Sequence, residues 1–227
     1  SEFAPKYFKK CIKILNNSEI FCSGGIIEYK SSGIIGNSIR IAQSSNFGVG
    51  GVAFRKKNSK ENFVETLAFG AYKRKIFELI GGYDEELIKN QDDEFNFRMN
   101  QKGYKIWLDP GIKSYYHSRN NFKKLFTQYY YYGFYKVRVI QKRTGFSSWR
   151  HLVPGLFVLS LVFSIFYKII DKESIILYFI FSVYMSFNII SAITEMSDKS
   201  DIKDYGKKAM ICLNVIISFI ILHFSYG

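Results

Sequence analysis

The sequence of 227 residues contains only three prolines and three cysteines. So little proline, together with 18% aromatic residues, excludes a collagen-like or low-complexity protein and a disordered polar tail, because this much apolar surface has to be buried. The cysteines, Cys11, Cys22 and Cys212, form no CxxC pair and have no histidine close by. This spacing predicts reduced thiols and excludes a disulfide framework or a zinc site.

Two further signals are missing. No apolar core follows a basic patch at the N-terminus, so a secretory signal peptide is not expected there. Neither paired cysteines and histidines nor an aromatic RNA-binding signature occurs, so the net charge of +13 does not predict a nucleic-acid partner. That excess charge lies entirely in residues 1–151, which hold 26 of the 32 basic and 13 of the 19 acidic side chains. We expect this basic part to meet anionic membrane lipids.

Long apolar runs are confined to the last third of the chain, at residues 152–170, 175–194 and 209–224. A membrane span needs roughly 17–25 mostly apolar residues, so the first two runs qualify. The third is marginal, because it is short and contains Asn214. A buried helical hairpin of a soluble protein is the alternative, but such helices normally carry a polar stripe that the first two runs lack. We therefore expect two or three transmembrane helices.

Lysine and arginine are distributed unevenly around these runs. The link between the first two runs offers only Lys172. Basic residues are frequent before the first run and after the second, at Lys136, Arg138, Lys142, Arg143, Arg150, Lys199, Lys203, Lys207 and Lys208. The positive-inside rule then predicts a multi-pass membrane protein with a cytoplasmic N-terminal part.

The segment 134–151 mixes aromatic residues with five of these basic ones. Such a composition predicts a segment in the lipid headgroup layer, and a solvated helix between domains is the alternative. The predicted division is thus a soluble domain at 1–133, a basic aromatic interfacial segment at 134–151 and transmembrane helices at 152–227.

The soluble part shows alternating helix and strand patterns. Apolar residues at helical spacing predict a helix at 5–15, and two further helices are expected at 73–79 and 92–101. Strands are expected at 19–29, 63–71 and 104–108. Glycines punctuate this pattern: Gly24 and Gly25 interrupt the first strand, Gly81 and Gly82 end the second helix and Gly103 ends the third. The last strand is expected to stop at residues 109–111. The pattern is α/β, but no initial apolar strands with a phosphate-binding loop are found, so the first half of a parallel sheet is missing.

Five ordered segments carry a family resemblance. They are FGAYKR (69–74), IGGYDE (80–85), NQDDEFNFR (90–98), GYKIW (103–107) and QYYYYG (128–133). Together they resemble the second half of family 2 glycosyltransferases, and within that family the succinoglycan-biosynthesis type, over residues 4–154. The resemblance implies a partial GT-A (nucleotide-diphospho-sugar transferase) domain, the acceptor-side half, followed by the transmembrane helices.

The resemblance implies an inverting hexosyltransferase of exopolysaccharide or cell-surface polysaccharide biosynthesis in a bacterial cell membrane. It would move a sugar from a nucleotide-sugar donor to a polyprenyl-linked saccharide at the cytoplasmic face. Two other functions stay open: a polyprenyl-phosphate sugar synthase and a noncatalytic membrane scaffold.

An acceptor hydroxyl that attacks an anomeric carbon needs an ionised base within hydrogen-bond reach. In the family this base is the Asp of a Glu-Asp pair, with a second acid two residues on and an Arg six residues on. The matching positions are Gln91, Asp92, Glu94 and Arg98, so Asp92 is the predicted base, although Gln91 replaces the preceding Glu. Asp92 also opens a predicted helix, whose dipole favours a charged carboxylate. Glu94 is expected to support the site and Asp93 to be solvated, and a plain helix cap is the alternative for all three acids.

A divalent cation, Mg²⁺ or Mn²⁺, is implied for the full-length enzyme, because the leaving nucleoside diphosphate has to be neutralised. The family holds this cation with an Asp-x-Asp motif just before the helix that corresponds to residues 4–15, and no such motif occurs in this sequence. We therefore expect the chain to lack the donor-binding half and to be inactive as given. His117, 25 residues after Asp92, matches a histidine that reaches the metal or diphosphate in many relatives, and a polar loop residue is the alternative.

Two other segments are assigned to the acceptor. Phe69, Gly70 and Ala71 resemble the acceptor-side strand, where small residues let the backbone approach a ligand. Asp84 is expected to be a structural turn residue before the predicted catalytic helix.

Gln128 begins the segment that in processive synthases of the family reads Gln-x-x-Arg-Trp. Here Tyr131 and Tyr132 replace the Arg and Trp. This departure favours the addition of one sugar per acceptor, with the tyrosines as stacking surfaces for a sugar ring. An aromatic belt at the membrane surface is the alternative.

Overall fold

The computed structural model describes residues 1–227 except 57, 144–148, 172–174 and 198–203. The chain forms two compact units that interleave along the sequence. The first unit comprises Ser1–Lys30, Gly51–His117 and Tyr135–Ser147, and the second comprises Ser31–Gly50, Ser118–Phe134 and Ser148–Gly227. The functional division into 1–133, 134–151 and 152–227 stays a prediction.

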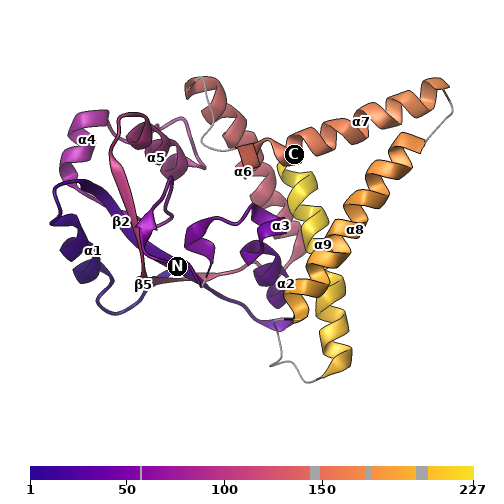
Figure 1. The fold of residues 1–227 in the computed structure, drawn as a ribbon, viewed down its shortest axis with the longest axis horizontal. Coiled ribbons are helices and arrows are strands. Elements are labelled where there is room, and N and C mark those ends of the chain that lie inside the picture. The colour runs from indigo at the N-terminus through magenta and orange to yellow at the C-terminus, as the bar shows by residue number, and fades with distance from the viewer. Residues whose placement is uncertain (57, 144–148, 172–174, 198–203) are drawn as a thin grey trace. The chain divides into compact units, whose positions relative to one another are not determined.

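The first unit is built on one mixed sheet (Figure 1). Its described strands are β1 (Glu2–Phe3), β2 (Ile20–Lys30), β3 (Asn62–Phe63), β4 (Ala71–Tyr72) and β5 (Lys105–His117). The long strands β2 and β5 pair in parallel, whereas the other pairings are antiparallel, in the order β1-β5-β2-β4 with β3 also beside β5.

Helices complete the first unit and confirm the predicted α/β class. They are α1 (Tyr7–Leu15), α4 (Arg74–Ile80) and α5 (Gln91–Gln101), with a short 3-10 helix at Ala53–Arg55. The end of α4 is as predicted, since Gly81 has a φ of 83° that favours glycine. Phe95 and Met99 of α5 are fully buried in one core cluster with Ile106 of β5. The buried face of α5 therefore contains Phe95 and Met99, and residues on the opposite face remain available to contact solvent or a ligand.

The predicted end of the last strand at residues 109–111 is wrong, because β5 continues to His117. The turn signal is real but local: Asp109 Oδ1 accepts the N–H of Gly111 at 2.6 Å, inside an irregularity of the β2–β5 register. Gly25 does not interrupt β2 either. A Cβ at this position would lie 1.8 Å from the carbonyl oxygen of Ile112, so glycine allows the two strands to approach at the bulge.

The strand predicted at 63–71 is also wrong in extent. Only its ends belong to strands, in β3 and β4. The apolar character of the intervening segment has another cause, since Leu67 is fully buried in the core cluster. A continuous apolar run without a partner strand therefore reflects burial of a loop.

The second unit is helical: α2 (Gly33–Ser44), α3 (Asn46–Val49), most of α6 (Phe122–Arg143), a 3-10 helix at Trp149–His151, α7 (Val153–Asp171), α8 (Ile175–Ser197) and α9 (Tyr205–Tyr226). Within the described residues α7, α8 and α9, orange to yellow in Figure 1, are long and apolar enough to cross a membrane. The third apolar run is thus no weaker than the others, because α9 extends it to 22 residues.

Helix α9 differs from α7 and α8 in its surroundings. Of its apolar window 39% is buried by protein, against 11% in each of the other two. Val215 and Phe219 pack with Ile39 and Ala42 of α2, which the sequence analysis did not predict as a helix, and with Leu125 of α6. The chain before β3 therefore supplies a helix to the unit that holds the membrane-length helices.

Candidate active site at the start of α5

The predicted base opens helix α5. Asn90 precedes the helix with a φ of 63°, in the left-handed region that asparagine tolerates better than most residues. Its carbonyl oxygen accepts the N–H of Glu94 at 2.9 Å and closes the first turn. Three consecutive acids, Asp92, Asp93 and Glu94, lie in this turn, and each meets a different environment.

Asp92 is exposed, so water and a substrate hydroxyl can reach its carboxylate. Among the described residues no lysine, arginine or histidine forms an ion pair with it. The protein around its other sides still removes hydration, and this desolvation raises the pKa of Asp92, with a further contribution from the charge of Asp93. Backbone N–H groups of the turn and the charge of Lys136 oppose the rise only in part. Asp92 is therefore an accessible carboxylate that binds a proton more strongly than an ordinary aspartate.

Asp93 was predicted to be solvated, but its side chain is largely buried in an ion pair. Its Oδ2 accepts a hydrogen bond from the Nζ of Lys136 on α6, and the two side chains are only 19% and 9% exposed. Because both charges are largely withdrawn from water, this pair is held more firmly than a surface ion pair.

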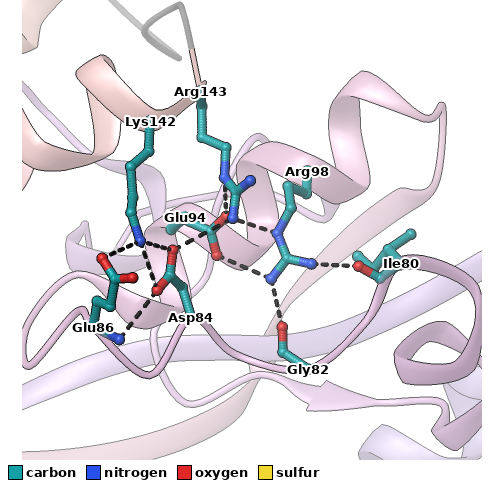
Figure 2. A network of polar contacts seen from close by, with 8 residues as sticks. All are labelled: Ile80, Gly82, Asp84, Glu86, Glu94, Arg98, Lys142 and Arg143. Atoms are coloured by element: carbon teal, nitrogen blue, oxygen red, sulfur yellow. Dashed lines mark hydrogen bonds and ion pairs between the residues drawn. The ribbon is translucent and has the colours of Figure 1, made fainter.

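Glu94 is fully buried and is held by two arginines (Figure 2). Arg98, one turn along α5, donates to it from Nε at 2.7 Å and from Nη2 at 3.0 Å, and Arg143 of α6 donates from Nε at 2.6 Å. Arg98 also donates to the carbonyl oxygens of Ile80 and Gly82. The charged pair thus ties α5 to the end of α4 and to α6. That Glu94 supports the site stays a prediction.

Asp84 lies in the loop before α5 and forms the turn expected of it, accepting the N–H of Glu86 at 3.1 Å. It also binds Lys142 of α6, whose Nζ lies 2.8 Å from Oδ2 and 3.1 Å from Oδ1, and Arg143 Nη2 lies 3.5 Å from Oδ2 (Figure 2). The hydrogen bond from Lys142 lowers the pKa of Asp84. This contact with Lys142 was not predicted from the sequence.

The segment assigned to the acceptor combines a tight contact with backbone strain. A Cβ on Gly70 would lie 2.6 Å from the Sγ of buried Cys22, so a larger residue would have to displace this thiol. Phe69 has a φ of 59°, which is rare for a bulky side chain, and its carbonyl oxygen accepts the hydroxyl of Tyr7. Strained residues of this kind cluster at functional sites.

Two tyrosines near Asp92 were not singled out by sequence reasoning, although both lie in the resembling segments. The rings of Tyr72 and Tyr83 pack on Phe95 of α5, with centroids 5.3 and 5.0 Å away, and Tyr72 donates to Asn96 Oδ1 at 2.9 Å. Burial raises the pKa of both phenols, and the nearby charge of Asp92 adds to this. They therefore bring neutral hydroxyl groups to the neighbourhood of Asp92.

Of the other predicted site residues, Gln91 is the first residue of α5, and the rest belong to other elements. Gln128 belongs to the second unit, where its Nε2 donates to Tyr132 Oη at 2.9 Å and its Oε1 accepts from Arg119 Nε at 3.1 Å. Tyr131 on the same helix is 45% exposed. In the first unit, His117 ends β5 with its Nε2 3.0 Å from Glu2 Oε1. Gln91, before Asp92, is exposed.

A divalent cation needs several oxygen, nitrogen or sulfur ligands close together. Across the described part of the chain, no three His, Cys, Asp or Glu side chains gather in a group that could hold one. His117 has one acidic neighbour, Glu2, which it shares with Lys30 at 2.7 Å. The described residues therefore do not fit a divalent cation site, and the metal stays a prediction.

A mixed α/β unit with one exposed acid at a helix start, and three helices of membrane-spanning length, define a membrane protein with a candidate polar active site.

Comparison with models of protein families finds no match. The chain is 29% identical over 113 residues to the succinoglycan biosynthesis protein ExoA of Rhizobium meliloti (strain 1021), covering 50% of this chain and 34% of that protein.

A second relative is a transferase by name. The chain is 31% identical over 143 residues to the dolichyl N-acetyl-alpha-D-glucosaminyl phosphate 3-beta-D-2,3-diacetamido-2,3-dideoxy-beta-D-glucuronosyltransferase of Methanococcus voltae, covering 61% of this chain and 42% of that protein. The matches thus span well under half the length of either relative. These similarities confirm the predicted resemblance to glycosyltransferases of the succinoglycan-biosynthesis type.

Proposed function

We propose that the protein is an inverting glycosyltransferase that moves a hexosyl group from a nucleotide-sugar donor to a lipid-linked saccharide during cell-surface polysaccharide biosynthesis. The names of the two relatives support this, since one denotes succinoglycan biosynthesis and the other a glycosyl transfer with a dolichyl sugar phosphate. The helices of membrane-spanning length suit an acceptor that is itself anchored in lipid.

The main support for the proposal is that Asp92 differs from the other two acids of its turn in exposure and in ion pairing. Asp93 is paired with Lys136 and Glu94 is buried between two arginines, whereas Asp92 is exposed and has no ion pair among the described residues. A general base has to be accessible and ionised at neutral pH. Of these three acids only Asp92 meets the first condition.

In the proposed reaction a carboxylate oxygen of Asp92 takes the proton of the acceptor hydroxyl. The hydroxyl oxygen forms a bond to the anomeric carbon from the side opposite the leaving group, so the configuration inverts. The bond from that carbon to the donor diphosphate breaks, and its electron pair stays on the diphosphate. The raised pKa of Asp92 favours this role, because a more basic carboxylate is a stronger proton acceptor as long as it remains ionised.

Other parts of the proposal concern binding. We assign Phe69, Gly70 and Ala71, together with Gln128, Tyr131 and Tyr132, to the acceptor saccharide. Mg²⁺ or Mn²⁺ is the proposed cofactor of the whole protein, with His117 as one candidate ligand. The catalytic part is proposed to face the cytoplasm of a bacterial cell, on the evidence of the basic residues around the apolar runs.

The test is transfer of radiolabelled sugar into lipid by membranes that contain the full-length protein. UDP-[14C]glucose, UDP-[14C]galactose and GDP-[14C]mannose serve as donors, and an undecaprenyl-diphosphate disaccharide serves as acceptor. Asp92→Asn should lower the rate by at least about 100-fold, the usual contribution of a general base. Glu78→Gln, which changes an exposed acid on α4, is the matched control and should keep the wild-type rate.

Two outcomes oppose the proposal. Retention of transfer by Asp92→Asn would assign the base to another group. A product whose new linkage keeps the anomeric configuration of the donor, read from its NMR coupling constants, would exclude inversion.

A further inference from the structure

The basic residues at the end of α6 have a second use that the composition did not suggest. Their composition predicts that Lys136, Lys142 and Arg143 contact anionic lipid, but in the first unit all three form ion pairs with carboxylates. We refer to these three residues as the α6 clasp. Their partners are not scattered, because each lies within the first turn of α5 or in the loop that leads to it.

The pairs are specific in geometry. Lys136 binds Asp93, and Arg143 Nε lies 2.6 Å from Glu94 Oε1, so the two residues after Asp92 are both engaged. Lys142 Nζ lies 2.8 Å from Oδ2 of Asp84 and 2.7 Å from Oε2 of Glu86, and so holds the loop before the helix (Figure 2). The clasp thus contacts the chain on both sides of Asp92.

Charge explains why such a clasp is needed. Asp84, Asp92, Asp93 and Glu94 crowd the start of one helix, and like charges at this spacing repel one another. From α5 itself only Arg98 pairs with them among the described residues. The clasp brings three positive charges, and its ion pairs among the described residues are with Asp84, Glu86, Asp93 and Glu94 and not with Asp92.

Resting on the proposed function, we propose that Lys136, Lys142 and Arg143 are positioning residues for Asp92, which fix the first turn of α5 and neutralise its other acids while leaving the base unpaired. Arg143 acts mechanically, through buried Glu94. Lys136 acts electrostatically, because its partner Asp93 is the neighbour of the base.

The electrostatic role of Lys136 predicts how its removal changes the pKa of Asp92. The groups that face Asp92 are Asp93 on its own helix, Lys136 from α6, and the phenols of Tyr72 and Tyr83. Removing Lys136 withdraws a positive charge and leaves the charge of Asp93 uncompensated, and both changes raise the pKa of Asp92. Removing Asp93 as well more than cancels that rise, because the charge of Asp93 acts on Asp92 more strongly than the charge of Lys136 does.

The first experiment follows the carboxyl carbons by 13C NMR during a pH titration of the full-length protein, labelled with [4-13C]aspartate and held in lipid nanodiscs. Asp92→Asn identifies the signal of Asp92 by its loss. In Lys136→Met the titration midpoint of that signal should move to higher pH, and in Lys136→Met/Asp93→Asn it should fall to the wild-type position or below it. Lys75→Met removes an exposed lysine of α4 and should leave the midpoint unchanged.

The second experiment tests the positioning role of Arg143 by measuring sugar transfer at pH 7 with the donors and acceptor named above. Arg143→Met should lower kcat by roughly 10- to 100-fold with little change in KM, as expected of a misplaced catalytic group. If this variant does not fold, Arg143→Lys keeps the charge but removes the Nε donor, and should lower kcat by about tenfold on the same grounds.

The outcomes separate this inference from the proposed function. If Asp92→Asn is inactive while Lys136→Met keeps the wild-type midpoint and the Arg143 variants keep the wild-type kcat, the α6 clasp is not a positioning device, although Asp92 remains the base. If Asp92→Asn keeps full transfer, the proposed base is wrong, and the clasp falls with it as a catalytic device even where the midpoint moves.

Discussion

Replacing Arg98 by methionine probes the buried charge that anchors α5. The variant removes two hydrogen bonds to Glu94, at 2.7 and 3.0 Å, and two more to the carbonyl oxygens of Ile80 and Gly82. Glu94 is fully buried, so it cannot recover this loss by turning to water. Methionine retains much of the apolar stem, so the change isolates the guanidinium.

Breaking a buried ion pair by removing one partner typically costs about 3–5 kcal/mol. Arg143 still binds Glu94 Oε1 in the variant, which places the expected loss at the lower end, about 3 kcal/mol. Since about 1.4 kcal/mol corresponds to a factor of ten, the amides of α5 should exchange with deuterium at least about 100-fold faster.

The assay is hydrogen exchange with mass spectrometry on the full-length protein in nanodiscs, read on peptides that cover α5. Arg74→Met provides the matched control, because Arg74 is an exposed residue of α4 without an ion pair among those described. A surface change of this kind should stay within about 0.5 kcal/mol of the wild type. Exchange in Arg98→Met within threefold of the Arg74→Met value would refute the assigned role of the pair.

Three further predictions concern packing, linkage and orientation. Gly70→Ala should lower the free energy of unfolding by about 1–3 kcal/mol, because its Cβ would lie 2.6 Å from Cys22 Sγ, whereas Gly82→Ala meets nothing within 4 Å and should be near neutral in thermal unfolding. Because the folded protein raises the pKa of Asp92, the charged form is destabilising; Asp92→Asn should therefore be more stable than the wild type at pH 7, and urea titrations should show this advantage vanish below about pH 4, with a constant difference as the refuting result. A cysteine in place of Lys172 should react with an impermeant maleimide on intact cells, and labelling only after permeabilisation would reverse the proposed orientation.

Local signals predicted much of the fold correctly. The ends of helix α5 before Gly103 and of helix α4 at Gly81 follow from the left-handed φ that glycine supplies. The three helices of membrane-spanning length follow from long apolar composition, which needs no tertiary partner.

The elements that were predicted wrongly or not at all depend on contacts between residues distant in the sequence. β5 passes its turn signal because β2 pairs on both sides of the bulge, and Gly25 permits that approach. Helix α2 is stabilised by burial against α9, some 170 residues further on, which no local pattern reveals.

In the candidate site, too, contacts between distant residues could not be predicted from the sequence. Family resemblance selected Asp92 from a run of three acids, but composition could not say that Lys136 would hold Asp93 or that two arginines would enclose Glu94. The cations of α6 were assigned to lipid because a sequence displays their charge and not their partners. Tyr72 and Tyr83 were missed because their approach to Asp92 arises from packing on Phe95.

The central claim is that a single accessible carboxylate removes the acceptor proton, and the pH dependence of sugar transfer tests it most directly. In the wild-type protein kcat/KM should fall tenfold per pH unit below the pKa of Asp92, since only the ionised form accepts a proton. Asp92→Asn should be at least about 100-fold slower at pH 7 and should lack this acidic limb. A variant that retains both the rate and the acidic limb would contradict the assignment.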